Sequence, residues 1–156
     1  MKKVHFLNKF NPSVPKIWLH LTAGLVWLGV GLMLDTFASR WLKLSGFPTE
    51  LLLIAAGLSL AAGIYGFGFS KVAQKNIRRI GEYTSEKVCL FAFQSWTSYP
   101  LVAIMMGLGI YLRNYSTFPK SLLAILYLGI GSALFGAGLL YFAHIARTYR
   151  SQNTQI

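Results

Sequence analysis

Four long apolar stretches without a charged residue constrain the fold of this chain more than any other feature. They cover residues 17–34, 51–70, about 93–112 and 122–143, and none contains Asp, Glu, Lys or Arg. A helix needs roughly 20 predominantly apolar residues to cross the hydrocarbon core of a bilayer. An open strand in lipid would leave its N–H and C=O groups unpaired, and the alternation typical of barrel strands is absent. The sequence therefore predicts an all-α, polytopic integral membrane protein with four transmembrane helices.

The composition supports a membrane protein and argues against a nucleic-acid-binding protein. Hydrophobic residues make up 54% of the 156 residues and charged residues only 12%, which is too little polar surface for a soluble domain of this size. The net charge of +11 resides between the apolar stretches, without a basic stripe interleaved with aromatic residues. Anionic lipid headgroups explain such cations. We therefore expect the lipid bilayer as a partner and no nucleic acid.

The cations are divided unequally between the two sides of the predicted bundle. Eleven Lys and Arg residues fall in segments 1–16, 71–87 and 144–156, whereas four fall in segments 35–50 and 113–120. Loops rich in Lys and Arg stay on the cytoplasmic side of a membrane. The predicted location is thus the cell (inner) membrane, with several spans and with both termini in the cytoplasm.

A short sequence repeat suggests how the single domain, residues 1–156, is organised. Residues 47–54 and 118–125 share the pattern Phe-Pro-x-x-Leu-Leu-x-Ile at an offset of 71. Such self-similarity predicts a duplicated helical hairpin with halves at about 14–80 and 86–150. Because both halves insert with the same orientation, the axis relating them lies along the membrane normal. The alternative is that Phe-Pro-Leu-Leu is simply a frequent way to begin a helix.

The third apolar stretch differs from the others because it contains a polar cluster. Its helix is expected to begin after Thr84 or Ser85, which can cap it, and to include segment 94–99. Polar groups inside lipid are costly and often mark pathways or ligand sites. The candidate ligand or pathway residues, which the topology places at a similar depth near the cytoplasmic side, are His20, Gln94, Ser98, Tyr99, Pro100 and His144.

Two interpretations of this cluster remain open. In the functional one, Pro100 opens the third helix by removing a backbone hydrogen bond, and the side chains converge on a ligand. In the structural one, Tyr99 belongs to an aromatic belt, the histidines lie at the interface, and Ser98 bonds a carbonyl one turn back.

Small residues recur at helical spacing in all four stretches. Residues three or four apart share a helix face, and small side chains allow helices to approach closely in lipid. The predicted helix-packing residues are Gly24, Gly31, Ser59, Gly63, Gly66, Gly107, Ser132 and Gly136.

Carboxylates are too few and too scattered to suggest catalysis. Asp35 and Glu50 are expected to face outward at helix ends, whereas Glu82 and Glu86 lie in the central loop. No paired acids, nucleophile elbow or phosphate loop is visible, so no enzyme is predicted. The expected lack of a carboxylate within the bilayer also argues against a proton-coupled exporter.

The histidines raise the alternative of a haem or metal site. His20 and His144 on two helices of a bundle would suit axial haem ligation or a divalent metal. However, no carboxylate accompanies them, and a third metal ligand is not apparent. Cys89 is a lone cysteine on the reducing side. We therefore predict neither a cofactor nor a metal.

Two functions from different classes fit these features. The first is a channel or transporter component for a small neutral or anionic solute, acting as a homo-oligomer because four spans enclose little volume. Its cationic cytoplasmic mouth would concentrate anions. The alternative is a non-enzymatic membrane scaffold or accessory subunit, whose small-residue faces pack against a larger membrane partner.

Overall fold

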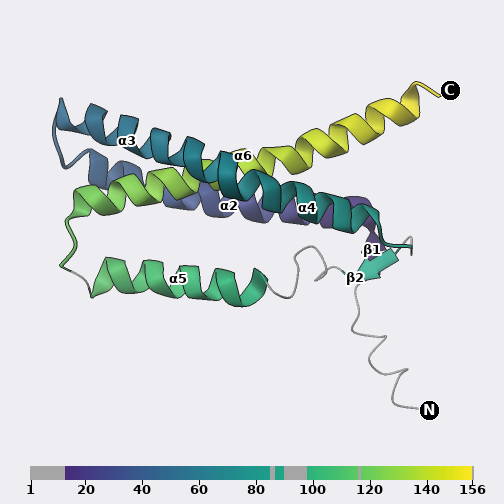
Figure 1. The fold of residues 1–156 in the computed structure, drawn as a ribbon, viewed down its shortest axis with the longest axis horizontal. Coiled ribbons are helices and arrows are strands. Elements are labelled where there is room, and N and C mark those ends of the chain that lie inside the picture. The colour runs from purple at the N-terminus through teal and green to yellow at the C-terminus, as the bar shows by residue number, and fades with distance from the viewer. Residues whose placement is uncertain (1–12, 85–86, 90–97, 116, 156) are drawn as a thin grey trace, which may run out of the picture.

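The computed structural model describes residues 13–84, 87–89, 98–115 and 117–155, and in these parts the chain is mostly helical (Figure 1). The elements in chain order are β1 (Ser13–Pro15), α2 (Lys16–Leu42), α3 (Thr49–Ile64), η2 (Tyr65–Phe69), α4 (Ser70–Gly81), β2 (Lys87–Cys89), α5 (Ser98–Asn114) and α6 (Lys120–Asn153). The π-helical turn η2 joins α3 and α4 into one continuous helix. The prediction of a mainly helical chain is confirmed.

Three of these helices are long and apolar enough to cross a membrane: Lys16–Leu42, Thr49–Gly81 and Lys120–Asn153. The described part of the third predicted span is α5, which is 17 residues long; residues 93–97 of that span lie outside the described residues. The membrane-protein character therefore stands on three helices.

Glycines lie at or shortly after the ends of two helical segments. Gly46 has a φ of +72°, a left-handed conformation that glycine adopts without steric cost, and it reverses the chain after α2. The second predicted span continues as a helix into the cationic segment and ends at Gly81.

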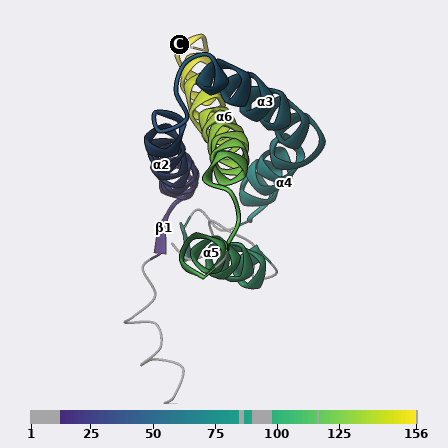
Figure 2. The same ribbon diagram turned by 90° about the vertical axis from the view of Figure 1, so that its left-hand side faces the viewer.

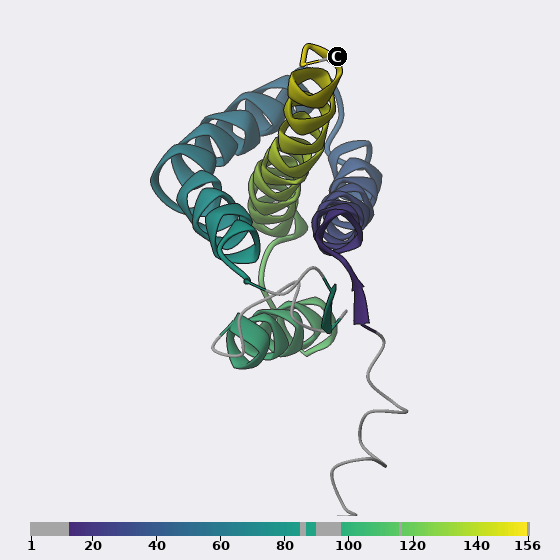
Figure 3. The same cartoon turned by 90° about the vertical axis from the view of Figure 1, so that its right-hand side faces the viewer.

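Helix α6 forms the centre of the bundle (Figures 2 and 3). It lies between α2 and the continuous helix formed by α3, η2 and α4. Helices α2 and α6 run antiparallel, because Gly24 faces Tyr141 and Phe142 whereas Gly31 faces Gly131 and Phe135. Helix α3 runs parallel to α6.

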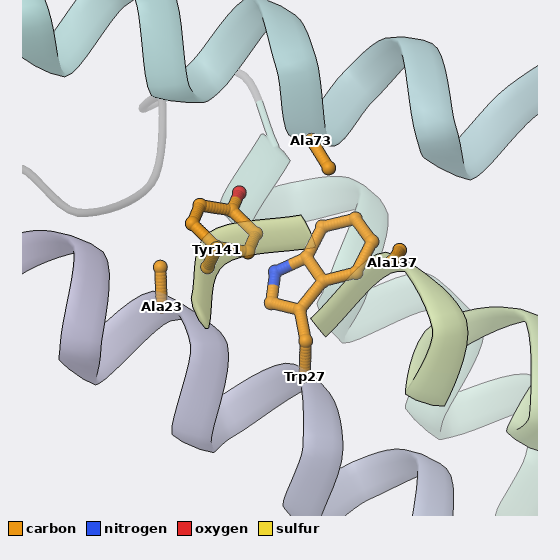
Figure 4. Packing of buried hydrophobic residues seen from close by; sticks show 5 residues of the cluster. All are labelled: Ala23, Trp27, Ala73, Ala137 and Tyr141. Carbon is orange, nitrogen blue, oxygen red and sulfur yellow. The ribbon is translucent and has the colours of Figure 1, made fainter. Parts of the chain in front are cut away.

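The described hydrophobic core joins α2, α4 and α6. Ala23 and Trp27 of α2, Ala73 of α4, and Ala137 and Tyr141 of α6 form one buried cluster (Figure 4). The Trp27 and Tyr141 rings lie 6.1 Å apart, and the alanines leave room for both. Small residues thus allow these helices to approach around two large aromatic rings.

Helix α5 lies to one side of the other helices in all three ribbon views. Its described contacts with them are near its C-terminal end. The Tyr127 hydroxyl of α6 donates a hydrogen bond to the Gly109 carbonyl at 2.9 Å. The Arg113 guanidinium lies 4.8 Å from the centre of the Phe37 ring of α2.

A short antiparallel ladder replaces the expected start of the third helix. Ser13, Val14 and Pro15 pair with Cys89, Val88 and Lys87. The prediction that Thr84 or Ser85 caps a helix running directly into the third span was therefore wrong, because β2 intervenes.

Candidate functional site

His20 and His144 lie side by side where α2 and α6 approach the cationic end of the bundle. Their ring centres are 4.9 Å apart, with the planes tilted by 33°. His20 is only 5% exposed, whereas His144 is half-buried. The two residues that the sequence placed at a similar depth are thus neighbours in space.

One nitrogen of His20 is buried without a hydrogen-bond partner. The Nδ1 atom lies 3.0 Å from the Lys16 carbonyl oxygen one turn earlier, and since a carbonyl only accepts, Nδ1 is the donor. The Nε2 atom has no partner within hydrogen-bonding geometry in the described parts of the chain. The Ile77 backbone of α4 also lies close to the ring and, like the Lys16 carbonyl, presents an acceptor to it. With Nδ1 as the donor of a neutral imidazole, Nε2 is a buried nitrogen without a geometrically formed hydrogen bond in the described residues.

An open groove lies beside His144, between α4 and α6. Its volume is about 580 Å³, and its lining residues come from one face of each helix: Gln74, Ile77, Arg78, Gly81, Glu82, Leu140, Ala143, His144 and Arg147. Glu82 is its one acid and lies 4.0 Å from Arg78. Arg147 and His144 add a positive and a polar side chain to the lining, so the groove favours a negatively charged ligand.

A buried polar network lies beneath this end of the bundle. Asn76, which is 7% exposed, donates from Nδ2 to the Tyr141 hydroxyl at 3.0 Å. Its Oδ1 atom accepts from Arg79 Nη2 at 2.8 Å and Nε at 3.2 Å. Arg79 Nη1 also donates to the Tyr83 hydroxyl at 3.3 Å. This network links α4 to α6 and fixes the wall of the groove.

Sequence reasoning missed Asn76, Tyr141 and Arg79. A usable signal exists for Asn76, because it shares one helical face with Ala73, Ile77 and Ile80, and a polar residue on an apolar face needs a partner. Nothing in the sequence pattern indicates that its partner is Tyr141.

The structure does not bring the whole predicted cluster together. Gln94 lies outside the described residues, and Ser98 and Tyr99 are described only as the first residues of α5. Pro100 is exposed and lies in the first turn of the described part of α5. Among the described residues, no contact joins Pro100 to His20 or His144.

The predicted packing residues fall into two groups. Gly24, Gly31, Ser132 and Gly136 lie at contacts between helices: a Cβ at Gly31 would be 2.7 Å from the Gly131 oxygen, and one at Gly136 would be 3.3 Å from the Tyr65 ring. A Cβ at Gly63, Gly66 or Gly107 would meet no described atom within 4 Å, and Ser59 is exposed and bonds the Ala55 carbonyl. The second group therefore does not lie at described helix contacts.

Four further glycines that do lie at close contacts are Gly57, Gly129, Gly131 and Gly138. They complete the faces by which α6 packs on α3 and α2. Their spacing in α6 is helical, so the sequence could have indicated them.

The histidine pair does not fit a haem held between two imidazoles. Axial ligands on opposite sides of one iron place their ring centres roughly 6 Å apart, since each metal–nitrogen bond is about 2 Å. The observed 4.9 Å is shorter than this. In the part of the chain that the structure describes, no group of three His, Cys, Asp or Glu side chains is assembled for a metal ion.

Asp35 is not at a helix end facing outward, and this prediction was wrong. Helix α2 continues to Leu42, and the Asp35 carboxylate points at α6, where its oxygens lie 3.4 and 3.5 Å from the Ser132 hydroxyl. Its Oδ1 atom also lies directly against the Cα side of Gly131. The bundle therefore contains a carboxylate at the crossing of α2 and α6, where the sequence had not led us to expect one.

Comparisons with protein families, curated proteins and solved structures give no significant match to this chain. The geometry of the site is therefore the basis for a functional conclusion.

Proposed function

We propose that this chain is a component of a membrane channel or transporter for a small anionic solute, and that the solute enters from the cytoplasm through the groove between α4 and α6. The observation that supports this most is the combination of Arg78, Arg147 and His144 around one groove whose acid, Glu82, is engaged with Arg78. Cations lining a concave surface raise the local concentration of anions. A small carboxylate or inorganic anion suits such a surface.

The histidine pair places polar side chains beside the groove. His144 lines the groove and contacts His20, whose Nε2 is buried without a described partner. Because His20 does not line the groove, His144 is the ring that a solute there would meet.

We also propose that α5, together with residues 93–97, forms a fourth span and that the cationic end of the bundle faces the cytoplasm. Helix α5 has no charged residue between Ser98 and Leu112. The start of α2, the end of α4 and the end of α6 lie at one end of the bundle, which agrees with the eleven-to-four division of cations (Figure 1).

The duplicated hairpin remains a proposal that one set of contacts supports. A Cβ at Gly57 would contact Leu128, and one at Gly136 would contact Tyr65. Both pairs are 71 residues apart, the same offset as the sequence repeat. Equivalent positions of two parallel repeats meet in this way at an axis along the membrane normal. Helix α5 does not repeat the packing of α2, so the support concerns α3 and α6.

Reconstitution into liposomes tests the function. Uptake of chloride, phosphate, acetate and the neutral solute glycerol would be measured for the wild-type protein and for Arg147→Gln, which removes a groove cation. Arg150→Gln is the matched control, because Arg150 lies in α6 three residues further on and does not line the groove. We expect anion flux that falls severalfold in Arg147→Gln and is unchanged in Arg150→Gln.

Equal loss of flux in both variants would show that the overall surface charge, and not the groove, attracts the anion. No flux of any probe in well-folded wild-type protein would contradict the proposal.

The second candidate function is a scaffold or accessory subunit, and the position of α5 favours it. Ile104, Met106 and Ile110 of α5 are each more than half exposed, and the described contacts of α5 with the other helices are few. In a scaffold, the exposed apolar side chains of α5 would pack against a larger membrane partner. The scaffold predicts no flux in liposomes and a membrane protein that copurifies with the wild type but not with Ile104→Ser/Ile110→Ser.

A further inference from the structure

The Asp35 carboxylate lies level with the middle of the neighbouring apolar stretches. It contacts Ser132, which is at the centre of the charge-free stretch 122–143 of α6. On the other face of α6, Gly129 packs on Leu60, which is at the centre of the charge-free stretch 51–70. Two helices thus place Asp35 at mid-depth independently.

The register between α2 and α6 explains why Asp35 is so deep. His20 lies beside His144, just beyond the end of the charge-free stretch of α6. The first turns of α2 therefore lie at the cationic surface, and α2 is long enough, at 27 residues, for its later half to lie within the bundle. The charge-free stretch of α2 is therefore shifted along the bundle by several helical turns relative to the charge-free stretches of α3 and α6.

The surroundings of Asp35 do not neutralise a negative charge. On the α6 side, the carboxylate faces Ser132, Gly131 and the backbone that packs against Gly31, and none of these groups titrates. The Ser132 hydroxyl is at the long limit of a hydrogen bond to the carboxylate. Within the described residues, no Lys, Arg or His nitrogen lies within 4.0 Å of the carboxylate. The nearest cations by position are Arg40, more than one turn later in α2, and Arg113 of α5, which lies over Phe37.

A second pocket lies at the end of the bundle opposite the histidines, further along α2 than Asp35. This pocket of about 390 Å³ between α2, α5 and the start of α6 is lined by Phe37, Arg40 and Arg113, among others. Asp35 does not line this pocket, because Phe37, two residues later, points to another side of α2. Asp35 is partly exposed and does not line the histidine groove either.

We propose that Asp35 is an intramembrane proton-binding site that takes up a proton and releases it as the bundle moves its solute. The step is a simple protonation, in which the carboxylate and one proton from water form the carboxylic acid. The coupling to solute rests on the proposed transport function, whereas proton binding itself does not. An ionisable residue at mid-depth without a fixed cation is functional far more often than it is structural.

Labelling with dicyclohexylcarbodiimide tests the site directly. This apolar reagent adds only to a protonated carboxyl group: the carboxyl oxygen bonds to the carbodiimide carbon and the proton moves to its nitrogen. Wild-type protein in detergent and in liposomes would be labelled over a range of pH, digested and mapped by mass spectrometry. We expect label on Asp35, decreasing about tenfold per pH unit once the acid is mostly ionised.

Matched variants make the result specific. Glu50→Gln removes an acid in the first turn of α3, near the surface, and should leave the labelling of Asp35 unchanged. Asp35→Asn keeps the shape of the side chain and should abolish the label. If Asp35 stays unlabelled at every pH while Glu50 is labelled, the proton site is refuted.

A flux measurement separates this inference from the proposed function. If wild-type anion flux responds to a pH gradient and Asp35→Asn retains flux without that response, both hold. Flux in the wild type that ignores the pH gradient would refute the coupling and leave the groove intact. Label on Asp35 without flux of any anion would refute the transport function and leave the proton site standing.

Discussion

Replacing Gly31 by alanine adds one methyl group at the closest approach of α2 and α6. A Cβ there would lie 2.7 Å from the Gly131 oxygen and 2.8 Å from the Phe135 nitrogen, both of which are backbone atoms. Comfortable contacts of carbon are at about 3.5 Å, so the helices must separate by roughly 0.5–1 Å. Because backbone atoms cannot rotate away, the adjustment falls on the whole crossing.

The expected loss follows from two opposing effects. Overpacking costs about 1–3 kcal/mol, and a gap of this size forfeits a quarter to a half of the nearby dispersion energy. Alanine is a better helix former than glycine by up to about 1 kcal/mol. The free energy of unfolding of Gly31→Ala should therefore fall by about 1–2 kcal/mol.

Gly63→Ala provides the matched control, because a Cβ at Gly63 would meet no described atom within 4 Å. It keeps the gain in helix propensity without the clash, so its stability should equal or slightly exceed that of the wild type. Unfolding in mixed micelles of mild detergent and dodecyl sulfate would measure both variants. Equal stabilities of Gly31→Ala and Gly63→Ala would show that the α2–α6 crossing is not as close as described.

Three further predictions concern topology, the polar network and the third span. A cysteine placed at Ser45 should react with an impermeant reagent added outside cells and one at Gln74 should not; the reverse pattern would invert the topology. Tyr141→Phe removes the hydrogen bond donated by Asn76 and should lower the free energy of unfolding by about 1–2 kcal/mol, measured by the same titration, whereas no change would make this bond dispensable. Ser98→Ala should abolish flux at an unchanged melting temperature if the polar segment of the third stretch is functional; wild-type flux would remove Ser98 from the mechanism.

Much of the helical architecture could be predicted because lipid leaves the chain few alternatives. A charge-free stretch of about 20 residues can only be helical in a bilayer, and glycines such as Gly81 mark where such helices end. Counting residues along each helix also predicted that His20 and His144 lie at a similar level, and in the structure they are neighbours. What counting cannot supply is the rotation of one helix against another, which decides that their rings meet at 4.9 Å.

The misplacement of Asp35 shows the same limit from another side. A charged residue after an apolar stretch usually marks the surface, and the sequence of α2 contains nothing that contradicts this. Its contact with Ser132 depends on the register of α2 against α6, where Gly31 and Gly131 set the contact. Likewise, Gly63 and Gly66 have packing-type spacing, but η2 rotates the helix at this point and α6 meets Tyr65 instead. The periodicity of a sequence identifies the packing face of a helix but does not determine which helix lies against that face.

Blocking the groove chemically tests the central claim most directly. Gln74 lines the groove and is exposed, so a cysteine there, in a Cys89→Ser background, should react with a negatively charged thiol reagent from the cytoplasmic side. Gln152→Cys near the end of α6 is the control, because it is exposed and lies outside the groove. The account predicts that the reagent stops anion flux into liposomes for Gln74→Cys and leaves Gln152→Cys unaffected. Complete modification of Gln74→Cys with undiminished anion flux would contradict it.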